Sequence, residues 1–235
     1  MFREHARSLF GVSLYQPRNI ELRVEGRVPF DPRALFAEEG LSEVCTPYLS
    51  QVPCSWGAVY FPEHFREFHD YLALRLSETI YDISEVIVPG VRSNRWTRSW
   101  KKYFNELVYL RGYVMLYPNY DLSLATNHAE IGAHVKKHPL EVSETVRRQF
   151  DVPLMPLASF PSETRSASLL KLPGESLPAW SELPVLDLWG TITSHHEIIH
   201  RGSERQELLS GCLLRLPQFN YDADDLLYSC TLPRV

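Results

Sequence analysis

Three parts of this sequence hold side chains of the kinds that enzymes use for catalysis. The first, residues 196–200, reads His-Glu-Ile-Ile-His and matches the HExxH pattern. In that pattern two histidines one helical turn apart bind zinc, and the glutamate activates a water molecule. The second, residues 222–224, is an Asp-Ala-Asp pair of carboxylates that can hold a divalent metal and a nucleotide diphosphate. The third is the stretch 93–134, where a helix glutamate precedes a loop rich in histidine.

The residues around the HExxH match decide how it is interpreted. Zinc proteases carry the motif on a buried helix with uncharged residues after the second histidine, whereas Arg201 and Gly202 follow it here. A catalytic zinc also needs a third protein ligand. The candidates for that ligand are Glu204, Glu207 and Asp222. We therefore favour an exposed helix rich in His and Glu. A zinc-dependent hydrolase that uses His196, Glu197 and His200 is the alternative.

The third part, residues 93–134, begins with apolar residues at helical spacing. Its apolar residues recur at spacings of 4, 4 and 3, at Trp96, Trp100, Phe104 and Leu107. This spacing predicts an amphipathic helix over 94–111 in which both tryptophans are mostly buried. Ser93 or Asn94 can act as its N-cap, and Gly112 is expected to end it. The apolar run 113–117 then predicts a short strand.

Glu106 is the candidate catalytic residue of this stretch. It lies at the boundary between the apolar and polar arcs of the predicted helix, so its carboxylate can point along the surface into a cleft. The alternative is a local ion pair with Lys102, four residues earlier. The loop after the strand adds further polar candidates, which are Asn127, His128, Glu130 and His134. A helix carboxylate, a buried strand and a His-rich loop together are typical of an active-site wall.

Length, charge and cysteine usage exclude several classes of protein. The 235 residues are 44% hydrophobic, and no apolar run approaches the roughly 18 residues of a membrane span. The N-terminus does not resemble a signal peptide, so we expect a cytoplasmic protein by default. A net charge of −5 argues against a general nucleic-acid binder, and we interpret the basic cluster from Arg92 to Lys102 as a solvated face. The four cysteines suit reduced, buried thiols, or a Cys45–Cys54 bridge.

The order of predicted elements indicates an α/β fold. The predicted strands are 10–15, 20–24, 58–61, 84–88 and 113–117, and the predicted helices are 62–78, 94–111 and 194–209. We expect the 58–61 and 113–117 strands to lie close together in a mixed sheet, with the first two helices covering one face. Residues 1–138 are expected to form this domain. Residues 139–235 are expected to be a Pro-rich wrapping segment with a C-terminal helix and tail, in which the pair at 222–224 is coincidental.

Three segments of the chain resemble a known family. Phe10–Arg18, Pro53–Pro62 and Trp96–His134 are similar to a group of eukaryotic glycosyltransferase-like proteins, which look like nucleotide-diphospho-sugar transferases of the GT-A type. The resemblance covers about residues 1–135 well and 183–190 loosely. It implies a partial GT-A-like mixed sheet with flanking helices. It also implies transfer of a sugar from a nucleotide-sugar donor to a glycan or another hydroxyl acceptor.

The resemblance also implies roles for particular residues. The turn Ser55-Trp56-Gly57 would line the sugar and acceptor pocket, and Glu106 would act as the general base on the acceptor hydroxyl. His128 or His134 would complete a Mn²⁺ or Mg²⁺ site; the alternative is a structural loop histidine. Substrate-binding roles fall to Asn105, Arg111 and Asn127. Positive charge for the leaving diphosphate would come from the metal or from Arg111, Lys136 and Lys137.

One departure from the family pattern changes the expectation for activity. In that pattern a metal-binding acidic strand precedes the Gly11–Arg18 segment, whereas this chain begins with Met1 shortly before it. We therefore expect the donor-binding half to be missing, and nucleotide sugars to bind weakly or not at all. A non-catalytic interaction module is the third hypothesis, beside the transferase and the zinc hydrolase.

Overall fold

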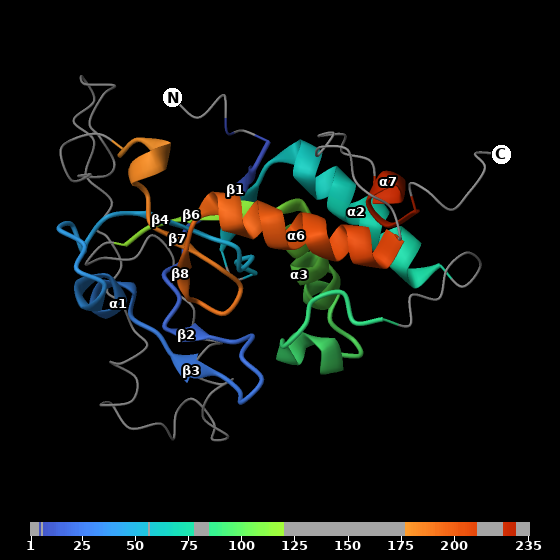
Figure 1. Ribbon diagram of the computed structural model, residues 1–235, viewed down its shortest axis with the longest axis horizontal. Helices are drawn as coiled ribbons and strands as arrows, with labels where there is room; N and C mark the ends of the chain where they lie inside the picture. The colour runs from blue at the N-terminus through green and yellow to red at the C-terminus, as the bar shows by residue number, and fades with distance from the viewer. Residues whose placement is uncertain are drawn as a thin grey trace, which may run out of the picture.

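A six-stranded mixed sheet forms the centre of the molecule (Figure 1). The computed structural model describes residues 5, 7–55, 57–77, 85–119, 177–210 and 223–228. The strands of the main sheet are β1 (Leu9–Ser13), β4 (Tyr48–Ser50), β5 (Ala58–Tyr60), β6 (Val114–Tyr117), β7 (Val185–Leu186) and β8 (Ile192–Thr193). Their spatial order is β5-β1-β6-β4-β7-β8, and β2 (Asn19–Ile20) pairs with β3 (Val28–Pro29) in a separate small sheet. The α/β prediction is confirmed.

Both parallel and antiparallel pairs occur in the main sheet. β1 runs parallel to β6, and β4 runs parallel to β7, while the pairs β1–β5, β4–β6 and β7–β8 are antiparallel. β5 and β6 flank β1 on its two sides, so the predicted proximity of the 58–61 and 113–117 strands is confirmed. β7 and β8 extend the same sheet, although they come from the part of the chain that was assigned to a second domain.

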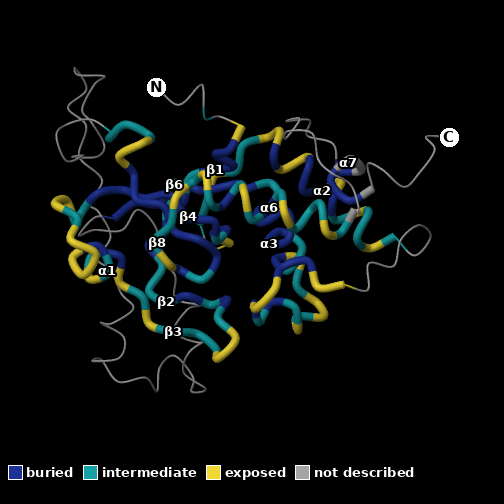
Figure 2. The backbone as a smooth tube through the Cα atoms, in the orientation of Figure 1, coloured by how far each residue is buried: buried dark blue, intermediate teal, exposed yellow. Residues whose placement is uncertain are grey.

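Alternation along the strands divides the apolar side chains between the two faces of the sheet. Phe10 and Met115 face a large core that the helices α2 (Pro62–Leu76) and α3 (Trp100–Arg111) complete. Leu9 and Val114, one position away, face a smaller cluster that Ile198 of α6 (His195–Ser210) closes. The remaining helices are α1 (Pro32–Glu38), α7 (Ala223–Tyr228) and the 3₁₀ turns η2 (Arg92–Arg95) and η5 (Trp180–Glu182). The strands β1, β4, β6 and β7 and the helix α3 are the most deeply buried elements (Figure 2).

Two glycines allow α3 and α6 to meet. Gly112 ends α3 in the left-handed region with φ of 65°, as the sequence predicts. A side chain at Gly202 of α6 would place its Cβ 2.4 Å from the Tyr109 carbonyl oxygen, so only glycine permits this approach. The HExxH helix is therefore fixed against the C-terminal end of α3.

The start of α3 differs from the prediction of a helix over 94–111. Residues 92–95 form η2, the α-helix begins only at Trp100, and Ser99 holds the N-cap position. Because Trp96 lies outside the helix, its spacing from Trp100 does not place the two rings on one face. Trp100 is 43% exposed, although its ring contacts Phe68 and Phe104, with ring centres 5.9 Å and 6.1 Å away. The prediction that Trp100 is mostly buried was wrong.

Two predicted strands are also absent from the main sheet. Of the segment 20–24 only Ile20 lies in a strand, and that strand pairs with β3. Ile20 and Leu22 are buried, as the alternation predicts, whereas Val24 is exposed. Of 84–88, the described residues 85–88 form no strand, and Ile87 and Val88 insert into the core as irregular chain. In both cases the apolar pattern identified burial but not hydrogen-bonded pairing.

The first turns of α2 and α6 begin as the sequence predicts. Pro62 begins α2 at a first-turn position, and Ser194 accepts a hydrogen bond from the Glu197 amide at 3.1 Å as the N-cap of α6. Cys45 and Cys54 are free thiols, so the alternative of a bridge between them is wrong. Within the described residues, no helix is long and apolar enough to cross a membrane.

We predict that truncating Phe104 destabilises the protein far more than truncating Trp100. Phe104 is fully buried between Phe10, Phe68 and Tyr60, so Phe104→Ala should lower the free energy of unfolding by about 3–5 kcal/mol. Trp100→Ala should cost less than half as much, because much of the ring already contacts water. Urea denaturation of both variants measures the difference. Equal losses would show that Trp100 belongs to the core.

Stability should fall as the pH drops below about 6.5, partly because of His64. Burial lowers the pKa of His64, although its 2.9 Å hydrogen bond from Nε2 to the Arg7 carbonyl oxygen opposes this. The unfolded chain therefore binds a proton that the folded chain excludes, and acid favours unfolding. His64→Gln should lose less stability than the wild type between about pH 7.5 and about pH 5.5. Equal losses in urea denaturation would assign the effect elsewhere, for example to His195, whose pKa burial also lowers.

Candidate functional site

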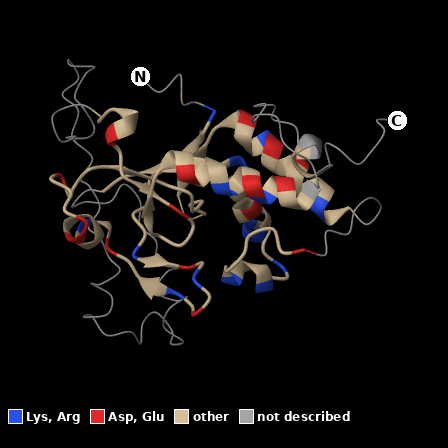
Figure 3. Cartoon of the chain, in the orientation of Figure 1, with Lys and Arg blue, Asp and Glu red and all other residues tan. Residues whose placement is uncertain are grey.

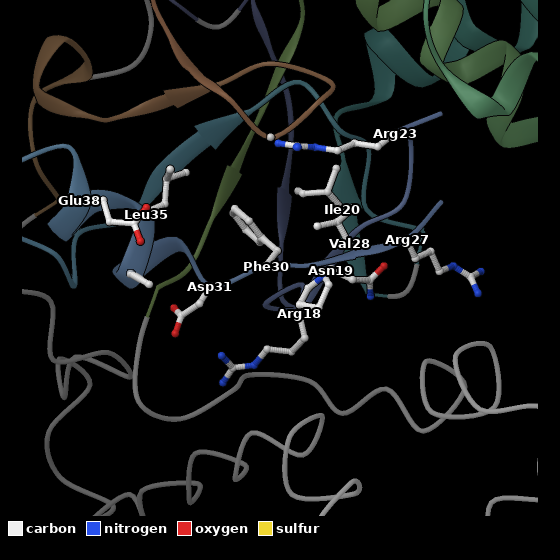
Figure 4. A pocket seen from close by; sticks show the side chains of 13 residues that line it. Arg18, Asn19, Ile20, Arg23, Arg27, Val28, Phe30, Asp31, Leu35 and Glu38 are labelled. Carbon is white, nitrogen blue, oxygen red and sulfur yellow. The ribbon is translucent and has the colours of Figure 1, made fainter. Parts of the chain in front are cut away.

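A cavity of about 770 Å³ lies beyond the carboxyl end of β1 (Figure 4). The small β2–β3 sheet and the start of α1 form its walls, and Gly190 closes one side. The segment that leaves β1 carries Arg18 and Asn19 directly into this cavity. β1 is parallel to β6, and the crevice beyond the carboxyl ends of parallel strands is where open α/β sheets bind ligands.

Three arginines line this cavity, which we call the arginine pocket. Figure 4 shows Arg23 above Phe30, Arg18 below it and Arg27 to the right. Arg23 is oriented by the Trp189 carbonyl oxygen, to which its Nε donates at 3.0 Å. Each guanidinium group offers a fork of donors suited to phosphate or carboxylate oxygens.

The Nε of Arg18 is buried and has no hydrogen-bond partner among the described residues. Burial lowers the pKa of Arg18 from its ordinary value, while the nearby Asp31 carboxylate opposes this. A buried N–H donor without an acceptor costs about 1–3 kcal/mol, so an anion seated beside Arg18 would offset that cost.

Two carboxylates and a phenylalanine ring also line the arginine pocket. Asp31 and Glu38 lie to the left of Phe30 in Figure 4. The Asp31 side chain also caps α1, because it accepts a hydrogen bond from the Arg33 amide at 3.0 Å. Phe30 packs edge-on against buried Tyr48, with ring centres 6.5 Å apart. With three arginines and two carboxylates the lining carries 3 − 2 = +1 charge, and Arg18 lies near the Asp31 carboxylate.

Hydrogen bonds fix the pocket wall to the main sheet. Arg33 of α1 donates from Nε to the Asn119 side chain at 3.4 Å, just after β6. Asn119 is buried, and its amide donates to the carbonyl oxygens of Val44 at 2.8 Å and Thr46 at 3.1 Å. These bonds hold α1, the chain before β4 and the end of β6 in one arrangement. The hydrogen bonds therefore fix the position of α1, which lines the arginine pocket, relative to the main sheet.

The structure places Glu106 away from the arginine pocket. Its carboxylate is buried between α2 and α3, where it accepts hydrogen bonds from Arg75 Nε at 2.9 Å and from the Tyr71 hydroxyl at 3.0 Å. The alternative partner Lys102 instead lies over the Tyr103 ring. Glu106 therefore occupies an interhelical ion pair, which differs in partner from the local one considered above.

Arg111, a predicted substrate-binding residue, takes part in a second ion pair of the same design. Its Nε donates to Glu67 of α2 at 2.7 Å, and the Tyr113 hydroxyl donates to the other Glu67 oxygen at 2.6 Å. The Glu67 side chain is completely buried. Each helix thus gives one glutamate and one arginine to the other, and we call this arrangement the helix clamp.

The remaining predicted site residues are dispersed. Asn105 is fully buried in α3, and its amide has no hydrogen-bond partner among the described residues. Ser55 is exposed, and the Gly57 carbonyl oxygen accepts a hydrogen bond from the Leu14 amide at 2.8 Å. The other candidates lie outside the described residues; they are Trp56, Asn127, His128, His134, Lys136 and Lys137. The Mn²⁺ or Mg²⁺ site at His128 or His134 stays a prediction.

The HExxH histidines lie on the exposed side of α6. His196 and His200 have stacked rings 6.4 Å apart, and Glu197 forms an ion pair with Arg201 at 2.8 Å. Glu204, a predicted third ligand, lies 3.5 Å from His200. Across the described ranges, no group of three or more His, Cys, Asp or Glu residues could hold a metal ion. The arrangement agrees with the favoured exposed helix.

Sequence reasoning missed the arginine pocket. Its arginines occur at positions 18, 23 and 27 and follow neither helical nor strand periodicity. They line one cavity because Ile20 pairs with Val28, which folds the segment back on itself. The available signal was a group of three arginines beside Phe30-Asp31 at the start of a helix.

Comparison with known proteins gives one local match. Residues 31–80 match the family model described as the SPBC1E8.03c C-terminal domain. No curated protein and no solved structure gives a significant match. The matched stretch includes α1 of the arginine pocket and α2 of the helix clamp, and the family description names no activity.

Loss of a clamp glutamate should destabilise the fold. Glu106→Gln leaves the Arg75 guanidinium buried without its carboxylate, so the free energy of unfolding should fall by about 3–5 kcal/mol. Glu197→Gln is the matched control, because its ion pair with Arg201 is partly exposed and should contribute less than about 1 kcal/mol. Urea denaturation compares the two. A Glu106→Gln variant as stable as wild type would free Glu106 for the catalytic role predicted from the sequence.

Proposed function

We propose that this protein binds a phosphate-bearing sugar compound of the nucleotide-sugar class in the arginine pocket. The observation that carries the proposal is the lining of the pocket, in which three arginines and two carboxylates surround Phe30 (Figure 4). A compound with both anionic oxygens and hydroxyl groups complements these side chains. The glycosyltransferase-like resemblance implies the same class of ligand, whereas the expected absence of a donor-binding half predicted weak binding or none; the arginine pocket is the reason we now propose binding.

The arginines of the pocket support recognition of a phosphate group. Arg18 offers a buried Nε donor without a partner among the described residues, and Arg23 is held in place by the Trp189 carbonyl oxygen. Bidentate contacts between guanidinium and phosphate are strong because they combine opposite charge with matched geometry. A diphosphate can span two such groups, whereas a neutral sugar has no negative charge to pair with them.

The carboxylates and Phe30 support recognition of the sugar and of the nucleotide base. Asp31 and Glu38 supply carboxylate oxygens that accept hydrogen bonds from hydroxyl groups. Phe30 offers a ring on which a flat heterocycle can stack, and Tyr48 supports that ring from behind. A cavity of about 770 Å³ falls within the usual range for small-ligand sites.

Binding in this pocket does not require Glu106. That residue lies in the helix clamp, so any sugar transfer at the pocket would use Asp31 or Glu38 as the base on an acceptor hydroxyl. Asp31 would then serve both as the cap of α1 and as the proton acceptor. Glycosyl transfer is the wider hypothesis, and ligand binding is its first requirement.

Calorimetric titration with UDP-glucose tests the proposal. We expect binding that weakens at least about tenfold in Arg18→Ala, because a charge-assisted hydrogen bond is lost. Arg66→Ala is the matched control, since Arg66 is an exposed arginine on α2 outside the pocket, and it should bind like the wild type. Repeating the titration with and without Mn²⁺ shows whether the metal predicted at His128 or His134 contributes.

Titration with UDP, uridine and glucose tests which class of compound the arginine pocket binds. UDP should bind more weakly than UDP-glucose, while uridine and glucose alone should bind poorly because they lack phosphate. Absence of UDP-glucose binding, or equal binding by wild type and Arg18→Ala, would refute the proposal. Equal binding of glucose and UDP-glucose would also refute it, because the arginines would then play no part.

A further inference from the structure

A second surface, away from the arginine pocket, combines exposed arginines with exposed tryptophan. Residues 92–102 carry five cations and no carboxylate, and they form η2 and the first turn of α3. Figure 3 shows Lys and Arg gathered on the short helix at this place. We call the surface formed by Arg92, Arg95, Trp96, Arg98, Trp100 and Lys102 the basic–aromatic surface.

The cations of this surface are available for a partner. Lys101 is buried against Glu21, but no described carboxylate forms an ion pair with Arg92, Arg95, Arg98 or Lys102. Arg95 and Arg98 are exposed, and Arg92 lies over the Trp96 ring at 5.9 Å. Positive side chains also crowd the N-terminal turn of α3, the end of a helix that favours negative charge. The fold retains these cations although nothing in the described chain neutralises them.

Aromatic rings continue the surface across α2. Trp100 contacts Phe68 with ring centres 5.9 Å apart, and Phe68 contacts Phe65 at 6.0 Å. Trp100 is 43% exposed and Phe65 is 47% exposed, so two large rings meet water on either side of a buried one. Exposed Trp and Arg side chains in one place are the composition of protein-binding hot spots.

We propose that the basic–aromatic surface docks an acidic peptide segment of a partner protein through an apolar anchor residue. The anchor would contact Trp100 and Phe65, while acidic residues beside it would face Arg95 and Arg98. This inference is independent of the arginine pocket. It differs from the interpretation of the same cluster as a solvated face, because a solvated face has no need of exposed aromatic rings.

Charge distribution favours a compact peptide over an extended polyanion. The whole chain carries −5, and residues 92–102 carry +5, so the rest of the chain carries −5 − 5 = −10. A nucleic acid or an anionic membrane presents negative charge over a wide area and would be repelled by the remainder of the molecule. A short acidic segment meets only the basic–aromatic surface.

Fluorescence anisotropy tests the proposal with a labelled peptide of about a dozen residues, rich in glutamate and with one central phenylalanine. We expect binding that weakens at least about tenfold in the double variant Arg95→Glu/Arg98→Glu, and that declines as salt is added. Trp100→Ala should weaken it as well, because the anchor contact is lost. Arg66→Glu reverses an exposed arginine on the solvent side of α2 and should bind like the wild type. Circular dichroism confirms that each variant is folded.

Control ligands decide between the possible partners. A peptide with lysine in place of glutamate should not bind, and replacing the phenylalanine by serine should weaken binding. Absence of binding by the acidic peptide would overturn the proposal, as would equal binding by wild type and Arg95→Glu/Arg98→Glu. Stronger binding of polyuridylate or of phosphatidylserine vesicles than of the acidic peptide would also overturn it, in favour of a nucleic acid or a membrane.

Discussion

The helix clamp between α2 and α3 is the interaction on which the rest of the structure depends. Glu67 pairs with Arg111 and Glu106 pairs with Arg75, and a tyrosine hydroxyl donates to each glutamate. Such buried charges are tolerated only when every partner is present and well oriented. The clamp therefore permits one register between the two helices, and those helices complete the main core over β1 and β6.

The clamp also explains where a ligand can bind. Its carboxylates and guanidinium groups form ion pairs that hold the helices together. The catalysis predicted at Glu106 and the substrate binding predicted at Arg111 would therefore require these ion pairs to break. The arginine pocket lies elsewhere, on a segment that leaves β1, and the Nε of Arg18 there has no hydrogen-bond partner among the described residues. The charges of the helix clamp and the charges that we propose for ligand binding thus occupy different parts of the molecule.

Local signals in the sequence predicted much of the fold. Pro62 begins α2, Gly112 ends α3 and Ser194 caps α6, since each effect depends on one residue and its neighbours. The clamp and the pocket escaped prediction because they join residues far apart in the chain, such as Glu67 with Arg111. Trp100 was misplaced because the helix starts later than its spacing indicates. The histidine and tryptophan candidates outside the described residues stay predictions.

A crystal structure of the protein with saturating UDP-glucose would show directly whether the arginine pocket recognises this ligand. We expect a phosphate oxygen within hydrogen-bond distance of Arg18 Nε, the base stacked on Phe30, and sugar hydroxyl groups facing Asp31 or Glu38. An empty arginine pocket under these conditions, or UDP-glucose bound at the helix clamp beside Glu106, would contradict the proposed binding.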